Sequence, residues 1–187
     1  GYEPDDRVDA LMYWVNDLGL DVEVTRSIYT SDVTAVEVAR SLQREHPGCD
    51  IAVVAGARVL GRNPKVNNLA SMVRAAKHEY WLISDSNVRV RPNYLSETMS
   101  AFDDPAVGMA TNLIAGVGEH SLGALLENQQ LNSFVLGCMS GAELLTPMAC
   151  VVGKSMAFRR THLEELGGWP SLADILAEDY VLAQRFH

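Results

Sequence analysis

The chain has 187 residues, the length of one ordinary domain, and 48% of them are hydrophobic, enough for one sizeable core. With 21% charged residues, 7 prolines and 14 glycines, it falls outside the disordered, collagen-like and low-complexity classes. A net charge of −9 argues against general nucleic-acid binding, which depends on many phosphate contacts from basic side chains. We therefore expect a single domain over residues 1–187 with no nucleic-acid partner.

Strand and helix patterns alternate through the first half of the chain. Valines alternate with polar residues over 22–27, and residues 50–54 form a short apolar run suited to a buried strand. A helical period separates them and stops at Pro47-Gly48. The alternation then recurs, with helices marked by residues 66–76 and 92–102 and strands over 80–84 and 107–111. This order predicts an α/β fold in which helices flank a mostly parallel, Rossmann-like sheet.

The second half is less regular. We expect a helix over 121–135 and strands over 149–152 and 155–158. Thr161 and Glu164 have capping-box spacing for a short helix that Gly167-Gly168 would stop in a left-handed turn. A last helix is expected to begin near Glu178-Asp179 and to run to the C-terminus.

Asp85 directly follows the predicted strand over 80–84. In parallel sheets ligands bind beyond the carboxyl ends of strands, and a carboxylate there can hold a divalent cation that bridges substrate phosphates. Ser86 and Asn87 come next and are small and polar. The same residues also suit an Asx turn, and the spacing alone favours neither interpretation.

The basic side chains are concentrated around this strand end. Residues 58–91 contain seven basic and two acidic side chains, a net charge of +5, whereas the rest of the chain sums to −14. Lys65 lies near a predicted helix N-terminus, where backbone N–H groups and the helix dipole favour an anion such as a diphosphate. A solvated basic face is the alternative.

Two further features leave a structural and a functional interpretation open. Glu178 and Asp179 would stabilise the dipole of a first helical turn, or one of them would act as a general base toward an acceptor hydroxyl. Likewise, Gly167-Gly168-Trp169 would be a helix stop with a core tryptophan, or a bend that presents an aromatic face to an acceptor.

Four segments resemble the ceramide glucosyltransferase family, bacterial members included, within the processive, family 2-like glycosyltransferases of GT-A fold. Residues 61–69 resemble its G-x-N-P-K-x-N-N-L block, and residues 84–90 its D-S-x-x-R-V block. Residues 156–169 resemble the acceptor-side segment that ends in Gly-Gly-aromatic, and residues 177–180 contain E-D-Y. The resemblance extends over most of residues 50–187.

The resemblance implies an inverting enzyme that moves a hexose, glucose or N-acetylglucosamine, from a UDP-sugar to a lipid hydroxyl such as that of ceramide. It implies Mg²⁺ or Mn²⁺ as cofactor and Asp179 as the general base. The implied roles of the other residues are donor binding by Asp32, Lys65, Asn67, Asp85 and Ser86, metal binding by Asp85 and Asn87, and acceptor contact by Gly168, Trp169 and Glu178.

The chain also departs from the family pattern. Residues 29–35 keep only Asp32 where the family has a D-x-D-D-P-A-like run. The resemblance implies that the family's first strand and its C-terminal Q/R-x-x-R-W motif and membrane segments lie outside these 187 residues. We expect a soluble piece of a membrane-associated protein with its catalytic domain on the cytoplasmic side. The alternatives are a degenerate, non-catalytic sugar-nucleotide-binding module and a nucleotidyltransferase.

Overall fold

The computed structural model describes residues 23–28, 33–48, 50–55, 59–85, 88–145 and 150–187. Its first half alternates strands and helices as predicted, and the strand over 80–84 has the expected bounds. In chain order the elements are β1 (Glu23–Ile28), α1 (Val33–Glu45), β2 (Asp50–Ala55), α2 (Pro64–Met72), β3 (Tyr80–Ser84), α3 (Tyr94–Ser100), the 3₁₀ turn η1 (Ala101–Asp103) and β4 (Met109–Thr111).

The second half differs from the prediction in two places. The helix expected to end at residue 135 continues to Leu145, two residues before Pro147, because no helix-breaking proline comes earlier. The strand expected over 149–152 is wrong for its described residues, 150–152, since the Val152 N–H bonds the Thr111 hydroxyl at 3.2 Å. The elements are α4 (Leu122–Gln129), the π-helical η2 (Gln130–Val135), α5 (Leu136–Leu145), β5 (Ser155–Arg159), α6 (Arg160–Glu165), the 3₁₀ turn η3 (Trp169–Leu172) and α7 (Glu178–Phe186).

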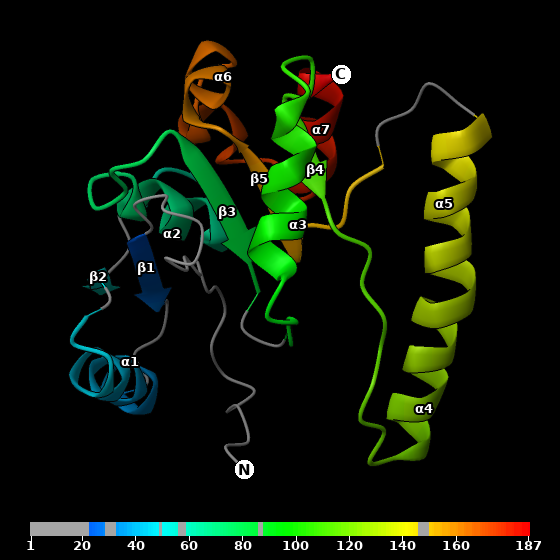
Figure 1. The fold of residues 1–187 in the computed structure, drawn as a ribbon, viewed down its shortest axis with the longest axis horizontal. Helices are drawn as coiled ribbons and strands as arrows, with labels where there is room; N and C mark the ends of the chain where they lie inside the picture. Colours follow the sequence, from blue (N-terminus) through cyan, green and yellow to red (C-terminus); the bar gives the residue numbers. More distant parts are fainter. Residues whose placement is uncertain (1–22, 29–32, 49, 56–58, 86–87, 146–149) are drawn as a thin grey trace.

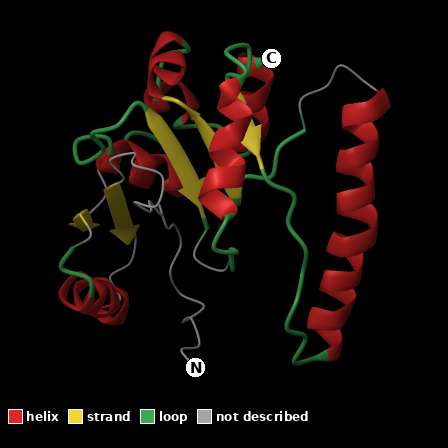
Figure 2. Ribbon diagram, viewed as in Figure 1, coloured by secondary structure: helices red, strands yellow, loops and turns green. Residues whose placement is uncertain are grey.

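The described strands form two small sheets, and their directions are mixed. β1 and β2 pair in parallel, as a strand-helix-strand unit requires. In the other sheet the order is β3-β5-β4, with β5 antiparallel to both neighbours (Figure 2). The α/β class is confirmed, while the antiparallel β5 is a feature that the sequence pattern did not indicate.

Side-chain alternation along β3 and β5 separates two apolar layers. Trp81 and Ile83 of β3 lie in a buried cluster with α2, η3 and α7 on one face of the sheet. Leu82, between them in the sequence, points to the other face and packs with Phe102 of η1 and Ala157 of β5. Because successive strand residues face opposite sides, this sheet is covered by helices on both faces. Figure 1 shows α3 in front of the sheet, with α6 and α7 toward its upper end.

The turn after α6 has the predicted left-handed glycines. Gly167 and Gly168 have φ values of 95° and 62°. Their N–H groups donate to the carbonyls of Glu164 and Leu163 at 3.1 and 2.8 Å, respectively. These are the two hydrogen bonds of a Schellman motif. The capping box predicted at the other end is wrong, because the Thr161 hydroxyl bonds the Glu79 carboxylate at 2.7 Å instead of the helix backbone.

The helices α4, η2 and α5 form one continuous rod that stands apart from the sheets in Figure 1. Asn132 ties the rod to the preceding segment through two bonds with the backbone of Gly116, at 2.7 and 2.9 Å. Several of its large apolar side chains are exposed, among them Leu126 at 63% and Phe134 at 66%. Within the described ranges, no helix has both the length and the apolar character that a membrane crossing requires.

Candidate functional site

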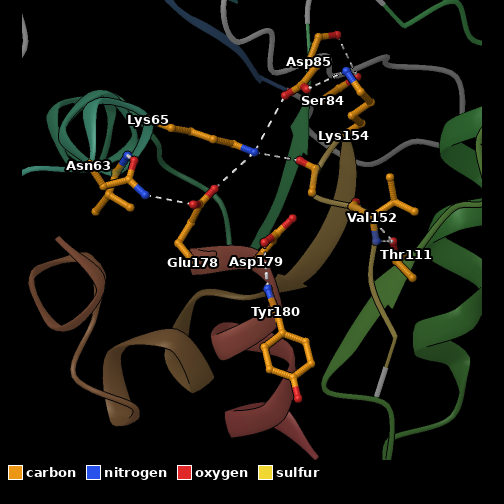
Figure 3. Close-up of polar contacts among 12 residues, drawn as sticks. Asn63, Lys65, Ser84, Asp85, Thr111, Val152, Lys154, Glu178, Asp179 and Tyr180 are labelled. Carbon is orange, nitrogen blue, oxygen red and sulfur yellow. Dashed lines mark hydrogen bonds and ion pairs between the residues drawn. The ribbon is translucent and has the colours of Figure 1, made fainter. Parts of the chain in front are cut away.

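Four charged side chains meet where two strands and two helices begin or end (Figure 3). Asp85 follows β3, Lys154 precedes β5, Lys65 is the second residue of α2, and Glu178 is the first residue of α7. The strand register places Ser84 opposite Ser155, and the Asp85 N–H donates to the Lys154 carbonyl at 3.1 Å. We call Lys65, Asp85, Lys154 and Glu178 the ion-pair cluster.

Lys65 is the centre of this cluster. Its Nζ lies 3.4 Å from Glu178 Oε1 and 3.8 Å from Asp85 Oδ1, and it donates to the Gly153 carbonyl at 2.9 Å. Lys154 Nζ faces the second oxygen of Asp85 at 3.3 Å. The Glu178 side chain is 8% exposed and the other three are 21–36% exposed, so solvent screens these contacts less than those of surface pairs. Both oxygens of Asp85 therefore face cations.

Local sequence explains how Lys65 reaches the cluster. Asn63 caps α2, since its Oδ1 accepts from the Val66 N–H at 3.1 Å, and Pro64 fits the first helical position. The Asn63 amide nitrogen donates to Glu178 Oε2 at 2.8 Å and to the Ile175 carbonyl at 2.6 Å. One side chain thus starts α2 and joins it to the start of α7.

Asn67 holds the loop that leads into α2. Its Oδ1 accepts from the N–H groups of Leu60 and Gly61 at 2.9 and 3.1 Å, and its amide donates to the Gly61 carbonyl at 2.9 Å. The residue is buried. Of the residues that the resemblance assigns to the donor, Asn67 therefore shapes the loop beside the cluster, whereas Lys65 and Asp85 project into it.

The same loop docks on residues 173–175. The backbone N–H and the Nε of Arg62 both donate to Asp174 Oδ1, at 3.0 and 3.2 Å. These bonds, the backbone one foremost, hold the pKa of the Asp174 carboxyl below its usual value. The Asn63 N–H also donates to the Ala173 carbonyl at 2.8 Å.

Gly61→Ala is expected to destabilise the protein by about 1–3 kcal/mol, the usual cost of overpacking. A Cβ at this position would lie 2.5 Å from the carbonyl oxygen of Ala173, and the nearest atoms are backbone that cannot rotate away. Urea denaturation would measure the loss. Gly48→Ala is the matched control, since a Cβ there meets nothing within 4 Å. Equal stability of the two variants would contradict the close approach of the loop and Ala173.

Asp179 lies beside the cluster. Its Oδ1 accepts from the Tyr180 N–H at 2.8 Å, and its Oδ2 lies against Gly153, where an added Cβ would come within 2.2 Å of it. Gly153 also gives its carbonyl to Lys65. This buried glycine therefore contacts a lysine on one side and a carboxylate on the other.

The structure brings four of the predicted site residues together: Lys65, Asp85, Glu178 and Asp179. Asp32, Ser86 and Asn87 lie outside the described residues. Trp169 is 4% exposed and packs edge-on against Phe158 with ring centroids 6.0 Å apart. The burial of Trp169 favours the interpretation as a helix stop with a core tryptophan, and the acceptor contact that the resemblance implies for this residue stays a prediction.

Sequence reasoning missed Asn63, Gly153 and Lys154. The Asn-Pro pair before Lys65 signals a helix N-terminus, so the cap could have been found from the sequence. Nothing local marks Gly153 or Lys154, because their contacts depend on β5 lying beside β3.

The chemistry of the cluster suits a divalent cation held mainly by a ligand's phosphates. Mg²⁺ and Mn²⁺ sites of that kind need only one or two protein carboxylates. Asp85 offers one, already paired with two ammonium groups. Among the described residues no three His, Cys, Asp or Glu side chains gather into a group that could hold a metal.

The sequence matches known proteins over most of its length. Residues 23–187 match the model of glycosyl transferase family 21. The chain is 27% identical over 168 residues to ceramide glucosyltransferase 1 of Caenorhabditis elegans, and 30% identical over 191 aligned residues to the ceramide glucosyltransferase of Komagataella phaffii. These alignments include 87% and 84% of this chain but 35% and 37% of the relatives. The chain thus spans about a third of their length.

The fold has a solved counterpart. A mannosyltransferase from Pyrobaculum calidifontis, in complex with GDP-Man and Mn²⁺, superposes with a TM-score of 0.62 over 88% of this chain and 42% of that one, at 21% identity. The fold is therefore that of a GT-A-type glycosyltransferase, as the sequence predicted.

Proposed function

The chain belongs to glycosyl transferase family 21, and from that membership we propose that the protein moves a hexose, glucose or N-acetylglucosamine, from a UDP-sugar to a lipid hydroxyl such as that of ceramide. The names of its relatives support the sugar and the acceptor. The observation that carries the proposal is the ion-pair cluster, in which Lys65 and Lys154 converge on Asp85 beside the carboxylate of Asp179.

Asp179 is the proposed general base. Its carboxylate takes the proton of the acceptor hydroxyl while that oxygen bonds to the anomeric carbon of the sugar. The bond from this carbon to the diphosphate oxygen breaks, and its electron pair leaves with UDP. Attack opposite the leaving group inverts the anomeric configuration. Base and donor contacts then belong to separate residues, which mutation can separate.

The donor's diphosphate is proposed to lie at Lys65 and Asp85, with Asp32, Asn67 and Ser86 toward the rest of the nucleotide. Negative charge grows on the diphosphate as its bond to the sugar breaks, and the Lys65 ammonium at the start of α2 stabilises that charge. The acceptor is proposed to approach from the side of Gly168 and Trp169. Glu178, which the resemblance also assigns to the acceptor side, contacts Lys65 in the structure. Because the proposed acceptor is a lipid, we also propose that the full-length protein associates with a membrane, and from the family resemblance that this domain lies on the cytoplasmic side.

A divalent metal fits this arrangement. Asp85, with Asn87 two residues later, would hold Mg²⁺ or Mn²⁺, and the ion, when bound, would neutralise charge on the diphosphate. The Mn²⁺ in the complex of the mannosyltransferase of similar fold supports this assignment. The protein's own part is to supply the Asp85 carboxylate and to keep two ammonium groups beside it.

The test is product analysis with the intact protein, UDP-glucose, Mn²⁺ and ceramide. We expect glucosylceramide and free UDP in equal amounts, and no UDP release when ceramide is omitted. GDP-mannose serves as the matched donor control and should give no product. Release of pyrophosphate would identify a nucleotidyltransferase instead. UDP-glucose binding with no transfer to ceramide or to other lipid alcohols would identify a non-catalytic module.

A further inference from the structure

Glu178 is a buried carboxylate whose two oxygens contact different partners. Its Oε2 accepts from the Asn63 amide at 2.8 Å, and its Oε1 lies 3.4 Å from Lys65 Nζ. The residue is 6% exposed although it begins a helix, where acidic side chains normally point into solvent. Figure 3 shows its side chain directed toward α2. The contacts of Glu178 therefore lie on the side of the proposed donor.

The Lys65 side chain needs such a partner to keep one position. A lysine stem is flexible, and fixing it costs rotamer entropy. Lys65 Nζ is held by the Gly153 carbonyl, by Asp85 Oδ1 at 3.8 Å and by Glu178. Of the two carboxylates, Glu178 is nearer and less exposed. It also lies on a different element from Asp85, so the ammonium is held from two directions.

Asn63 makes this arrangement rigid. The same amide group that donates to Glu178 also donates to the Ile175 carbonyl, and its oxygen caps the helix that carries Lys65. Glu178 thus contacts both Asn63 and Lys65 and joins the first turn of α7 to the first turn of α2. A change in the charge of Glu178 would therefore act directly on Lys65, and on Asp85 only through Lys65.

We propose that Glu178 is a positioning residue that fixes Lys65 Nζ for the donor's diphosphate. The inference rests on the proposed function, because it needs Lys65 to contact a sugar nucleotide. Glu178 itself touches neither donor nor acceptor in this account, so it acts only through Lys65. If Glu178 acts only through Lys65, its substitution has no further effect on donor binding once Lys65 has been replaced. A purely structural role would not produce that result.

A double-mutant cycle on the intact protein tests it, with the dissociation constant of UDP-glucose in Mn²⁺ measured by calorimetry. Lys65→Met should weaken binding about 10- to 100-fold, because a hydrogen bond to a charged group contributes about 1.5–3 kcal/mol and each 1.4 kcal/mol is tenfold. Glu178→Gln keeps the bond from Asn63 but removes the charge, and should weaken binding about fivefold to tenfold. The double variant should bind within about twofold of Lys65→Met alone, since Glu178 has nothing left to position.

Two controls keep the result interpretable. Glu164→Gln makes the same substitution at an exposed carboxylate paired with Arg160 on α6, and should not change the dissociation constant. Thermal unfolding shows whether each variant is folded. If Glu178→Gln is unfolded, Glu178→Asp, which keeps the charge with a shorter side chain, takes its place in the cycle with the same expectation.

Additive losses in the double variant, or unchanged binding in Glu178→Gln, would overturn the positioning role while leaving the proposed function intact. Unchanged binding in Lys65→Met would overturn both the positioning role and the donor contact of Lys65. Wild-type protein that binds no UDP-glucose would remove the proposed function, and this inference with it.

Discussion

Asp179→Asn is expected to lower the rate of sugar transfer by about 10²- to 10⁴-fold, the usual contribution of a positioned general base. Asparagine has nearly the same shape, and its side-chain oxygen can still accept from the Tyr180 N–H, but it cannot take a proton from an acceptor hydroxyl. UDP-glucose should bind with unchanged affinity, because among the described residues the Asp179 carboxylate makes no ion pair or hydrogen bond with Lys65 or Asp85. Turnover and calorimetry on the intact protein measure the two effects separately.

Gly153→Ala tests the same carboxylate without altering it. The new Cβ would lie 2.2 Å from Asp179 Oδ2, so the carboxylate must move, and transfer should fall although Asp179 is present. Gly137→Ala on α5 is the matched control, since a Cβ there meets nothing within 4 Å. If Asp179→Asn retains turnover, or if it loses donor affinity in proportion to its rate, Asp179 is not a base acting apart from the donor contacts.

Asp85→Ala is expected to abolish the effect of Mn²⁺ on UDP-glucose binding. Losing even an outer partner of a metal ligand costs about 10- to 100-fold in metal affinity, so losing the ligand should cost at least about 100-fold. The metal-free affinity for UDP should persist or rise, because Lys65 and Lys154 keep their charges and lose the carboxylate that they share. Calorimetric titration with and without Mn²⁺ separates the two effects.

Asp103→Ala is the control for that experiment, since Asp103 is an exposed carboxylate in η1. It should leave the Mn²⁺ dependence unchanged. Metal-dependent binding that survives in Asp85→Ala would show that other residues hold the cation. Loss of metal-free UDP binding as well would show that Asp85 organises the two lysines instead of holding a metal.

The fold was predictable where local patterns are strong. β3 has the expected bounds because its apolar run ends in polar residues on both sides, and α7 begins at the expected acidic pair. Lys65, Asp85 and Asp179 lie in one region because each is at a strand or helix end at the same edge of the fold. The direction of β5 was not predictable, since side-chain alternation is the same in parallel and antiparallel strands.

The errors have physical causes as well. The prediction ended the helix over α4, η2 and α5 too early, because many of its leucines are exposed and the sequence therefore shows no clear apolar stripe. The capping box at Thr161 failed because the Glu79 carboxylate competes for the same hydroxyl, and Glu79 is remote in the sequence. The sequence left two positions open for Trp169, because the two glycines before it suit a core and a surface tryptophan equally; in the structure the turn directs its ring into the core.

The two ends of the segment between β4 and β5 are hydrogen-bonded to each other. The Thr111 hydroxyl bonds the Val152 N–H at 3.2 Å, and the Asn112 N–H donates to the Ser155 carbonyl at 3.3 Å. With the ends closed in this way, doubling the length of the intervening segment costs only about 0.6 kcal/mol of closure entropy. The length and sequence of the helical rod can therefore change at little cost in stability, while Gly153, Lys154 and the carboxylates beside them keep their positions.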